Sequence, residues 1–270
     1  MTLTATQDEA ALIETLAREA GALALSHFET LATVSVESKG HLDLVTAADQ
    51  DVEQFITRRL ARDFPDDGIF GEEGAAHQGR SGRIWVIDPI DGTFNFVRGG
   101  DQWAVSIGLY QAGRPTFGVI HAPVRDQTLV GGDGLPATLN GAPMAQRAGL
   151  DANRAACGVG FHPVIPVERR LQTLRFVLED ARMSFRCCGS ATISLIEVAV
   201  GQVDGYLGMG ESTWDLMAAV PILEQIGITS TVDWSRTDLT DKLRFACGTP
   251  EFLQAVEPMV PFGATPDTLL

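Results

Sequence analysis

The segment from Trp85 to Thr93, with the sequence WVIDPIDGT, constrains this chain more than any other. Its apolar beginning, from Ile84 to Ile87, is typical of a short buried strand. The strand runs directly into Asp88, and Asp91 follows three residues later on a turn that Pro89 stiffens. Carboxylates held this close repel each other unless a cation neutralises them, and hard oxygen ligands suit Mg²⁺ or Mn²⁺ better than zinc. The segment therefore predicts a metal site at the end of a buried strand.

Gly92 and Thr93 add a predicted seat for a phosphate group. Gly92 would let an anion approach the backbone, and Thr93 can open a short helix whose N–H groups face that anion. Taken alone, Asp91 to Thr93 would be an ordinary turn with Thr93 as a helix cap. The buried strand and the paired acids in front of these residues favour the functional interpretation.

Two further acidic sites are candidates for the same metal centre. Glu72 and Glu73 are adjacent in a loop bounded by glycines, which by itself would indicate a solvated turn. Asp215 follows Trp214 at the start of an apolar segment, where a carboxylate commonly compensates a helix dipole. Each of these pieces, taken alone, is better explained structurally than functionally.

The charge of the chain limits its partners. Its 270 residues include 20 basic and 35 acidic residues, which gives a net charge of −15. This balance argues against a sequence-independent hold on nucleic acid, and it disfavours an anionic substrate unless metal ions intervene. No apolar run approaches the roughly 20 residues of a membrane span, and the first seven residues lack the pattern of a secretory signal. We therefore expect a cytoplasmic protein.

Neither the cysteines nor the histidines form a motif. The cysteines lack a C-x-x-C pair, so neither a zinc site nor a redox site is indicated, and buried free thiols are expected. The histidines have no i, i+4 pairing, so core or surface positions are expected and a catalytic role is disfavoured. The residues are Cys157, Cys187, Cys188, Cys247, His27, His41, His77, His121 and His162.

The apolar spacing predicts one helix from Asp8, as its cap, to about Glu29, and a second that begins at Thr46 and stops before Pro65. No repeat or long linker interrupts the chain, so we expect one continuous α+β unit with mainly antiparallel sheets. The other expected elements are a strand at 84–87, a hairpin of 104–110 and 116–120, a strand near 155–159, a helix at 167–182, a strand near 184–187, a helix capped by Ser190 that runs through Val200, and a helix at 214–226 that Pro221 would kink.

Four motifs, in order, resemble the inositol monophosphatase family, within a wider superfamily of lithium-sensitive, Mg²⁺-dependent phosphatases. They are D-L-V-T-A-A-D at 43–49, G-E-E at 71–73, the WVIDPIDGT segment continued by N-F-V at 95–97, and W-D at 214–215. The resemblance covers about residues 8 to 227. It implies a layered α/β/α/β/α sandwich that forms a single domain over 1–270, with one half of about 1–145 and another of about 146–270. Members of the family are usually homodimers.

The same resemblance implies a set of metal ligands. Glu72, Asp88 and the carbonyl of Ile90 would hold a first Mg²⁺ ion, for which Mn²⁺ is a possible substitute. Asp88, Asp91 and Asp215 would hold a second ion, and Glu72 would also help with a more weakly held third. Such ions would reverse the local field of an acidic protein, so that a phosphate group could bind.

Thr93, hydrogen-bonded to Asp49, would orient and activate the attacking water. Thr46 and Asp49 also fit a capping box, so the acid could be partly structural. Phosphoryl transfer needs positioning and charge neutralisation more than covalent help, which agrees with this set of residues.

The substrate is less well determined than the reaction. The resemblance places Gly189, Ser190 and Ala191 in a loop that faces a sugar or polyol ring, although a simple helix cap explains this segment equally well. The Glu that contacts polyol hydroxyls in the inositol enzymes is matched here by Gly208, with Glu211 nearby but out of register. The implied substrate-binding residues are Asp91, Gly92, Thr93, Gly189, Ser190, Ala191 and Asp215.

Three functional hypotheses follow. The first is a metal-dependent phosphomonoesterase that acts on inositol monophosphate or a similar polyol or sugar phosphate. The second keeps this chemistry but acts on histidinol phosphate, fructose 1,6-bisphosphate or a nucleotide phosphate. Asn95 and Phe96 favour the inositol branch, whereas histidinol-phosphate phosphatases usually carry Arg at the position of Phe94. The third is a non-enzymatic family member that binds a protein of the RNA machinery.

Overall fold

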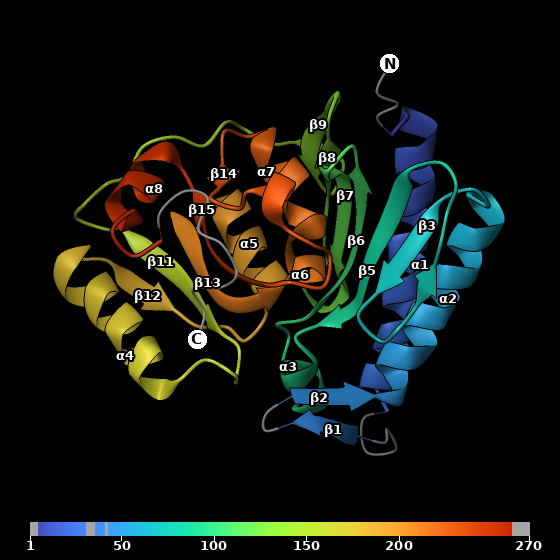
Figure 1. The fold of residues 1–270 in the computed structure, drawn as a ribbon, viewed down its shortest axis with the longest axis horizontal. Helices are drawn as coiled ribbons and strands as arrows, with labels where there is room; N and C mark the ends of the chain where they lie inside the picture. The colour runs from blue at the N-terminus through green and yellow to red at the C-terminus, as the bar shows by residue number, and fades with distance from the viewer. Residues whose placement is uncertain (1–4, 31–35, 41–42, 261–270) are drawn as a thin grey trace.

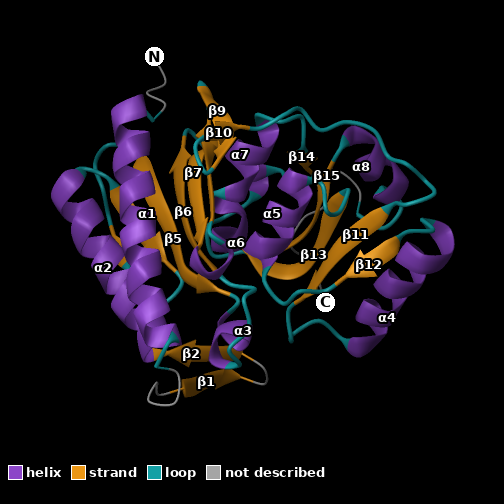
Figure 2. Ribbon diagram, turned by 180° about the vertical axis from the view of Figure 1, so that it is seen from behind, coloured by secondary structure: helices purple, strands orange, loops and turns teal. Residues whose placement is uncertain are grey.

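The computed structural model describes residues 5–30, 36–40 and 43–260, with side chains described for 5–30 and 46–260. Within these residues, helices and sheets alternate in layers (Figure 1). A helix pair, an eight-stranded sheet, a central group of helices, a five-stranded sheet and an outer pair of helices follow one another across the molecule (Figures 1 and 2). The structure thus confirms the mixed α+β fold and its α/β/α/β/α layering.

The first layer is the predicted helix pair, α1 (Gln7–Phe28) and α2 (Ala47–Asp63). Thr6 caps α1 through a capping box with Glu9, so the expected cap at Asp8 is wrong and Asp8 lies inside the first turn. Thr46 caps α2 as predicted, and Asp49 completes its capping box. Apolar residues of both helices pack against one face of the larger sheet and form one hydrophobic core with it.

The larger sheet has the strand order β10-β9-β8-β7-β6-β5-β3-β4, and its pairs are antiparallel except β3 with β5. The predicted hairpin is present as β6 and β7. The strands of this sheet are β3 (Gly68–Gly71), β4 (Ala76–His77), β5 (Arg83–Asp91), β6 (Ala104–Gln111), β7 (Arg114–Ala122), β8 (Gln127–Gly132), β9 (Leu135–Leu139) and β10 (Ala142–Pro143). A separate antiparallel pair consists of β1 (Val36–Gly40) and β2 (Asp43–Thr46).

The smaller sheet has the order β12-β11-β13-β15-β14 and mixes parallel with antiparallel pairs. Its strands are β11 (Ala156–Phe161), β12 (Ser184–Arg186), β13 (Gly205–Ser212), β14 (Thr229–Ser230) and β15 (Lys242–Gly248). The remaining helices are α3 (Thr93–Val97), α4 (Val167–Arg175), α5 (Ala191–Val200), α6 (Thr213–Met217), α7 (Ala219–Glu224) and α8 (Pro250–Val256).

Helices α5, α6 and α7 form the central layer and share a hydrophobic core with the facing sides of both sheets. The predicted single helix over 214–226 is wrong, because the chain forms α6 and α7 with a break at Ala218. Pro221 has no N–H to donate to the carbonyl of Met217, four residues earlier, so the helical ladder cannot continue through this point. Pro221 instead occupies the first turn of α7, where no such bond is needed.

The predicted helix over 167–182 is regular only to Arg175. A five-residue π-helical turn, Phe176–Asp180, continues it, with a hydrogen bond of 2.9 Å from the Ala181 N–H to the Phe176 carbonyl. Arg182 then adopts a left-handed backbone with φ of 54°, which ends the helical path.

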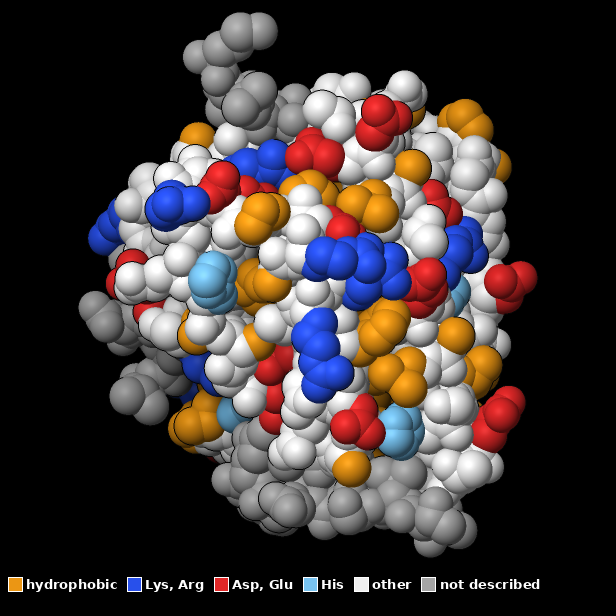
Figure 3. Space-filling model, turned by 90° about the vertical axis from the view of Figure 1, so that its right-hand side faces the viewer, with side chains coloured by type: hydrophobic (Ala, Val, Ile, Leu, Met, Phe, Trp, Pro, Cys, Tyr) orange, Lys and Arg blue, Asp and Glu red, His pale blue; other side chains and the backbone are white. Residues whose placement is uncertain are grey.

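The outer surface over α1 and α2 carries basic and acidic side chains that are interspersed rather than separated (Figure 3). An ion pair between the two helices joins Arg59 of α2 to Glu19 of α1, with 2.6 Å between the guanidinium nitrogen and the carboxylate oxygen. Among the helices in the described part of the chain, none combines the length and the apolar composition that a membrane crossing needs.

Candidate metal and phosphate site

The parallel strands β3 and β5 bring the first two acids together. Gly71, the last residue of β3, pairs with Ile87, and the N–H of Glu72 donates to the carbonyl of Ile87 at 3.2 Å. Glu72 and Asp88 therefore leave neighbouring strands side by side, and their side chains are hydrogen-bonded to each other. Parallel strands end at the same sheet edge, so two segments 16 positions apart supply adjacent carboxylates.

Asp91 reaches the same place because β5 is irregular. The strand continues through Asp91, with a bulge opposite β6 between Asp88 and Asp91, so the expected turn at Pro89 is wrong. The bulge inserts residues without a partner and changes the face to which a side chain points. The Asp91 carboxylate accepts hydrogen bonds from the Ser190 hydroxyl at 2.7 Å and from the N–H of Thr192.

Asp215 comes from the central layer. It is the third residue of α6, and its carboxylate accepts a hydrogen bond of 2.6 Å from the N–H of Ser212, the helix cap. The capping box fixes the direction of the side chain, which the expected dipole compensation alone would not do. The structural and the functional interpretations of Asp215 are therefore compatible.

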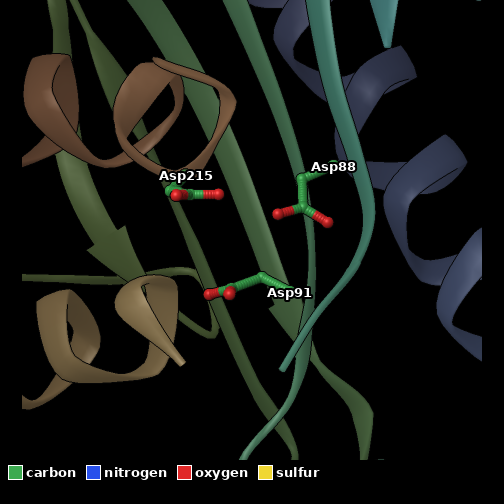
Figure 4. A group of neighbouring side chains, drawn as sticks. All are labelled: Asp88, Asp91 and Asp215. Carbon is green, nitrogen blue, oxygen red and sulfur yellow. The ribbon is translucent and has the colours of Figure 1, made fainter. Parts of the chain in front are cut away.

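The three aspartates form one cluster. Each of Asp88, Asp91 and Asp215 offers a carboxylate oxygen, and these oxygens lie within 4.8 Å of one another. The carboxylates point toward a common space between β5 and α6 (Figure 4). Asp88 and Asp215 are buried, with 1% and 9% of their surface exposed.

The charge balance of the cluster calls for a cation. Burial raises the pKa of Asp88 well above its ordinary value, and the neighbouring acids Glu72, Asp91 and Asp215 raise it further. Burial, followed by the charges of Glu211 and Asp91, likewise raises the pKa of Asp215 well above its ordinary value. Several carboxylates cannot all ionise at this separation without a compensating charge, and their oxygen atoms suit a hard divalent cation. The residues present therefore fit a Mg²⁺ site.

Thr93, Asp49 and Ile90 form a hydrogen-bonded group beside the cluster. The Thr93 hydroxyl lies 3.1 Å from Oδ1 of Asp49 and 3.0 Å from the carbonyl oxygen of Ile90. The other oxygen of Asp49 accepts hydrogen bonds from the N–H and the hydroxyl of Thr46, at 2.9 and 2.5 Å. Asp49 is fully buried, which raises its pKa, whereas these hydrogen bonds oppose that increase. One carboxylate thus caps α2 and contacts Thr93.

Gly92 has a structural reason that the sequence did not indicate. It caps α3 with a left-handed backbone, φ 96°, and a Cβ at this position would lie 2.4 Å from the carbonyl oxygen of Gln102. Both features require glycine. The predicted short helix at Thr93 is present as α3, and it is five residues long.

Glu53 is a residue of the site region that the motifs did not reveal. Its buried carboxylate accepts hydrogen bonds from the N–H groups of Glu73 at 2.8 Å and Ala75 at 2.9 Å. It therefore fixes the loop that carries Glu72. A Cβ at Gly71 would lie 2.2 Å from the Glu53 carboxylate, which explains the glycine there. The only sign of Glu53 in the sequence was its position, one helical turn after Asp49 and next to the apolar residues of α2.

Two clefts adjoin the acidic cluster and share His162. One, of about 410 Å³, is lined by Glu72, Asp215, Trp214 and Lys242 among others. The other, of about 320 Å³, is lined by Asp91 and by the predicted substrate loop. In that loop Ser190 caps α5 and also donates to Asp91, so the cap and the site share one side chain.

The remaining lining residues of the second cleft correct one expectation and locate one histidine. Cys187 is exposed and lines this cleft, so the prediction of buried thiols holds for Cys157 and Cys247 but is wrong for Cys187. His162 lines both clefts, a position that its isolated place in the sequence did not indicate. The full lining is Asp91, Phe94, Gly160, Phe161, His162, Pro163, Arg170, Cys187, Gly189, Ser190, Ala191, Tyr206 and Glu211.

Comparisons with known proteins agree with this architecture. The model of the inositol monophosphatase family matches residues 6–256. The protein named Nus factor SuhB from Xylella fastidiosa is 36% identical over 216 residues, which cover 78% of this chain and 77% of that protein. Inositol-1-monophosphatase from Bacillus subtilis is 33% identical over 216 residues, which cover 79% of this chain and 81% of that protein.

Solved structures show the same likeness. The extragenic suppressor protein suhB from Bartonella henselae matches with a TM-score of 0.85 and 25% identity, covering 94% of this chain and 98% of that chain. The Thermotoga maritima IMPase matches with a TM-score of 0.80 and 27% identity, covering 93% and 98%. The chain therefore belongs to the inositol monophosphatase family of phosphatases.

Proposed function

We propose that this protein is a Mg²⁺-dependent phosphomonoesterase. The observation that carries the proposal is the group of three converging aspartates, Asp88, Asp91 and Asp215, whose carboxylates lie within 4.8 Å of one another in a largely buried place. Such a group cannot be fully ionised unless cations neutralise it, and cations at this edge would attract a phosphate dianion to a protein with a net charge of −15.

Two or three ions are proposed, with Mn²⁺ as a possible substitute. Glu72, Asp88 and the carbonyl of Ile90 would hold the first ion, and Asp88, Asp91 and Asp215 the second. Glu72 would share in a weaker third site. When bound, Mg²⁺ supplies positive charge to the transferring phosphoryl group and lowers the pKa of the attacking water.

The chain's own residues would position that water. If the Thr93 hydroxyl donates a hydrogen bond to Asp49, its lone pairs can accept a hydrogen bond from the attacking water. The proton of that water would pass to the Thr93 oxygen as the Thr93 proton passes to the Asp49 carboxylate. The two hydrogen bonds from Thr46 hold Asp49 in place for this task. Gly92 and the start of α3 would form the phosphate seat. In this proposal Thr93 and Asp49 direct a water molecule at the phosphorus, so no covalent intermediate forms on the protein.

The proposed substrate is inositol monophosphate or a similar polyol or sugar phosphate, and the proposed enzyme is inhibited by lithium. The support is the name of the Bacillus relative and the cleft of about 320 Å³ beside Asp91. Release of phosphate from inositol 1-phosphate, histidinol phosphate, fructose 1,6-bisphosphate and a nucleotide monophosphate with Mg²⁺ would test it. Turnover of inositol 1-phosphate far below that of another ester would exclude the inositol assignment.

A second candidate function is protein binding without catalysis. It is favoured by the name Nus factor SuhB, which the Xylella relative carries. A pull-down with wild type and Asp88→Asn separates the two functions. Under the catalytic proposal the variant loses phosphatase activity. A wild type that retains a partner but releases no phosphate from any ester would support the binding function instead.

We further propose a cytoplasmic homodimer. Four large apolar side chains with more than half of their surface exposed lie on or beside α4 and its π-helical turn, which is unfavourable for a monomer in water. They are Val164, Val167, Leu171 and Leu178. Light scattering of wild type and Leu171→Glu would test this surface, with a dimer expected for wild type and a shift toward monomer for the variant.

A further inference from the structure

Gly208 stands where the family pattern has a polyol-contacting Glu, and the structure shows why this position carries no side chain. A Cβ at Gly208 would lie 2.2 Å from Cε1 of Phe245 and 2.9 Å from Cγ of Glu211. Phe245 is fully buried and its ring packs at a tilt against that of Tyr206, with 5.7 Å between the ring centroids, so it cannot move aside easily. The space that a side chain at 208 would use is therefore occupied by Phe245 and Glu211.

A β-bulge explains how Glu211 reaches this space. In a regular strand, residues three positions apart point to opposite faces of the sheet. Here the register of β13 against β15 shifts between Met209, which pairs with Arg244, and Glu211, which pairs with Leu243. The extra residue is Gly210, with φ of 88°. One inserted residue reverses the alternation, so Glu211 faces the same side as Tyr206.

The contacts of Glu211 hold it in this direction. The Tyr206 hydroxyl donates to Oε1 of Glu211 at 2.6 Å. The pair lies directly over the bare backbone of β11, because a Cβ at Gly160 would be 1.8 Å from Oη of Tyr206 and 2.1 Å from Oε1 of Glu211. The Glu211 side chain also hydrogen-bonds the Asp215 carboxyl, so it stands at the junction of the acidic cluster and the second cleft.

Glu211 lines a cleft of about 320 Å³ beside Asp91. Arg170 also lines this cleft, and its guanidinium donates to the carbonyls of Ile165 at 2.7 Å and Pro163 at 2.6 Å, which fixes the loop beside His162. A carboxylate accepts up to four hydrogen bonds, and the Tyr206 hydroxyl and the Asp215 carboxyl use two of them, so further donors can bind. The groups that can use it are hydroxyl donors on a substrate whose phosphate lies at Asp91 and Asp215.

We propose that Glu211, held by Tyr206, accepts hydrogen bonds from the substrate's ring hydroxyls and sets the preference for polyol or sugar phosphates in place of a Glu at 208. This inference rests on the proposed function for the position of the phosphate. A site built to bind a hydroxyl discriminates strongly against an ester without one, because the buried acceptor then lacks a partner.

The test compares inositol 1-phosphate with phenyl phosphate, which has no hydroxyl, in wild type, Glu211→Gln and Tyr206→Phe. Gln keeps an acceptor for the Tyr206 hydroxyl but removes the charge, and Phe keeps the packing but releases Glu211. For Glu211→Gln, kcat/KM for inositol 1-phosphate should fall by about 10- to 100-fold more than for phenyl phosphate. Tyr206→Phe should show the same selective loss to a smaller degree. Glu257→Gln, an exposed acid after α8, is the matched control.

An equal fall in kcat/KM for both esters in Glu211→Gln would overturn the proposal. If the Mg²⁺ requirement also rose by about tenfold, the equal fall would place Glu211 in the ion site instead. If wild type hydrolyses neither ester, the proposed function fails. The binding of both esters in the presence of Mg²⁺ is then measured by calorimetry, which tests the role of Glu211 without catalysis. Tighter binding of inositol 1-phosphate that Glu211→Gln abolishes would support the present inference without catalysis. Equal affinities of wild type and Glu211→Gln would overturn it.

Discussion

The hydroxyl of Thr93 lies 3.1 Å from Oδ1 of Asp49, although the two residues are 44 positions apart in the chain. The same hydroxyl is 3.0 Å from the carbonyl oxygen of Ile90, and its single proton can serve only one acceptor at a time. Donation to Asp49 leaves the Ile90 carbonyl available to an ion and the Thr93 lone pairs available to a water molecule. The contact therefore links the cap of α2 to the proposed chemistry.

Thr93→Ala tests this contact. Removal of a positioned proton acceptor should lower kcat by about 10²- to 10⁴-fold, whereas Thr93→Ser, which keeps the hydroxyl, should retain most of the activity. Phosphate release from inositol 1-phosphate at saturating Mg²⁺ measures both variants. Wild-type kcat in Thr93→Ala would show that the hydroxyl has no role, and equal losses in both variants would indicate a packing defect.

Glu53→Gln tests the support of the loop that carries Glu72. The N–H groups of Glu73 and Ala75 donate to different oxygens of the Glu53 carboxylate. In Gln an NH₂ group replaces one of these oxygens, so one N–H loses its acceptor and the loop should lose its fixed position. Outer-sphere supports of this kind commonly change metal affinity or activity by about 10- to 100-fold, so the Mg²⁺ concentration for half-maximal activity should rise by that factor.

Glu19→Gln is the control for this experiment, because Glu19 forms an exposed pair with Arg59 of the same helix as Glu53. Exposed pairs contribute about 0–1 kcal/mol, so neither stability nor the Mg²⁺ requirement should change much. A Glu53→Gln protein that is less stable but has an unchanged Mg²⁺ requirement would limit Glu53 to a purely structural role.

Gly92→Ala should destabilise the folded protein in the absence of any ion. A non-glycine residue with a left-handed backbone costs about 1–2 kcal/mol, and the Cβ would in addition contact the Gln102 carbonyl at 2.4 Å. Gly113→Ala is matched, since Gly113 has φ of 82° but open space around the added atom. Urea unfolding with EDTA should give a larger loss for Gly92→Ala than for Gly113→Ala, and equal losses would show that the close contact is relieved.

The gain in stability from Mg²⁺ should depend on pH. Asp88 and Asp215 have raised pKa values in the folded, metal-free protein, so the folded state binds more protons than the unfolded state above the ordinary pKa of an aspartate. Their contribution to stability is therefore present at low pH and is lost as pH rises through the folded pKa values. Mg²⁺ replaces those protons, so its gain should be larger at pH 8 than at pH 5.5.

Urea unfolding with Mg²⁺ and with EDTA at both pH values measures this gain. Saturation at about 100 times the dissociation constant corresponds to about 2.7 kcal/mol. The burial of His121 lowers its pKa and makes the protein less stable as pH falls below the ordinary range of a histidine, but this acts equally with and without Mg²⁺ and cancels in the difference. A gain that is the same at both pH values would contradict proton displacement at the cluster.

The sequence predicted those features that depend on local periodicity or on a contiguous motif. The helix pair, the capping box at Thr46, the hairpin of β6 and β7, and α5 from its Ser190 cap through Val200 are confirmed. The layered fold was implied by a family resemblance, since the order of five layers depends on contacts between distant segments. Pro221 shows the limit of periodicity, because one missing N–H divides an apolar segment into two helices.

The candidate site shows the same division. The acids themselves were visible in the motifs, and the structure brings Asp88, Asp91 and Asp215 together. The bulge in β13 was not visible, because a register shift depends on pairing with β15, and so Glu211 was placed out of register. Glu53 was overlooked for a related reason, since its partners lie 20 and 22 residues away in a loop.

Mg²⁺-dependent phosphate release by wild type and Asp91→Asn tests the central claim most directly. The Asn side-chain oxygen can still accept from Ser190 and Thr192, so the fold should be kept while its amide group cannot replace a carboxylate ligand. We predict that wild type releases phosphate from inositol 1-phosphate only with Mg²⁺. In a folded Asp91→Asn protein this release should fall by more than about 100-fold, which exceeds the usual effect of an outer-sphere residue. Unchanged kcat in that variant would contradict the assignment of the aspartate cluster as the metal site of a phosphomonoesterase.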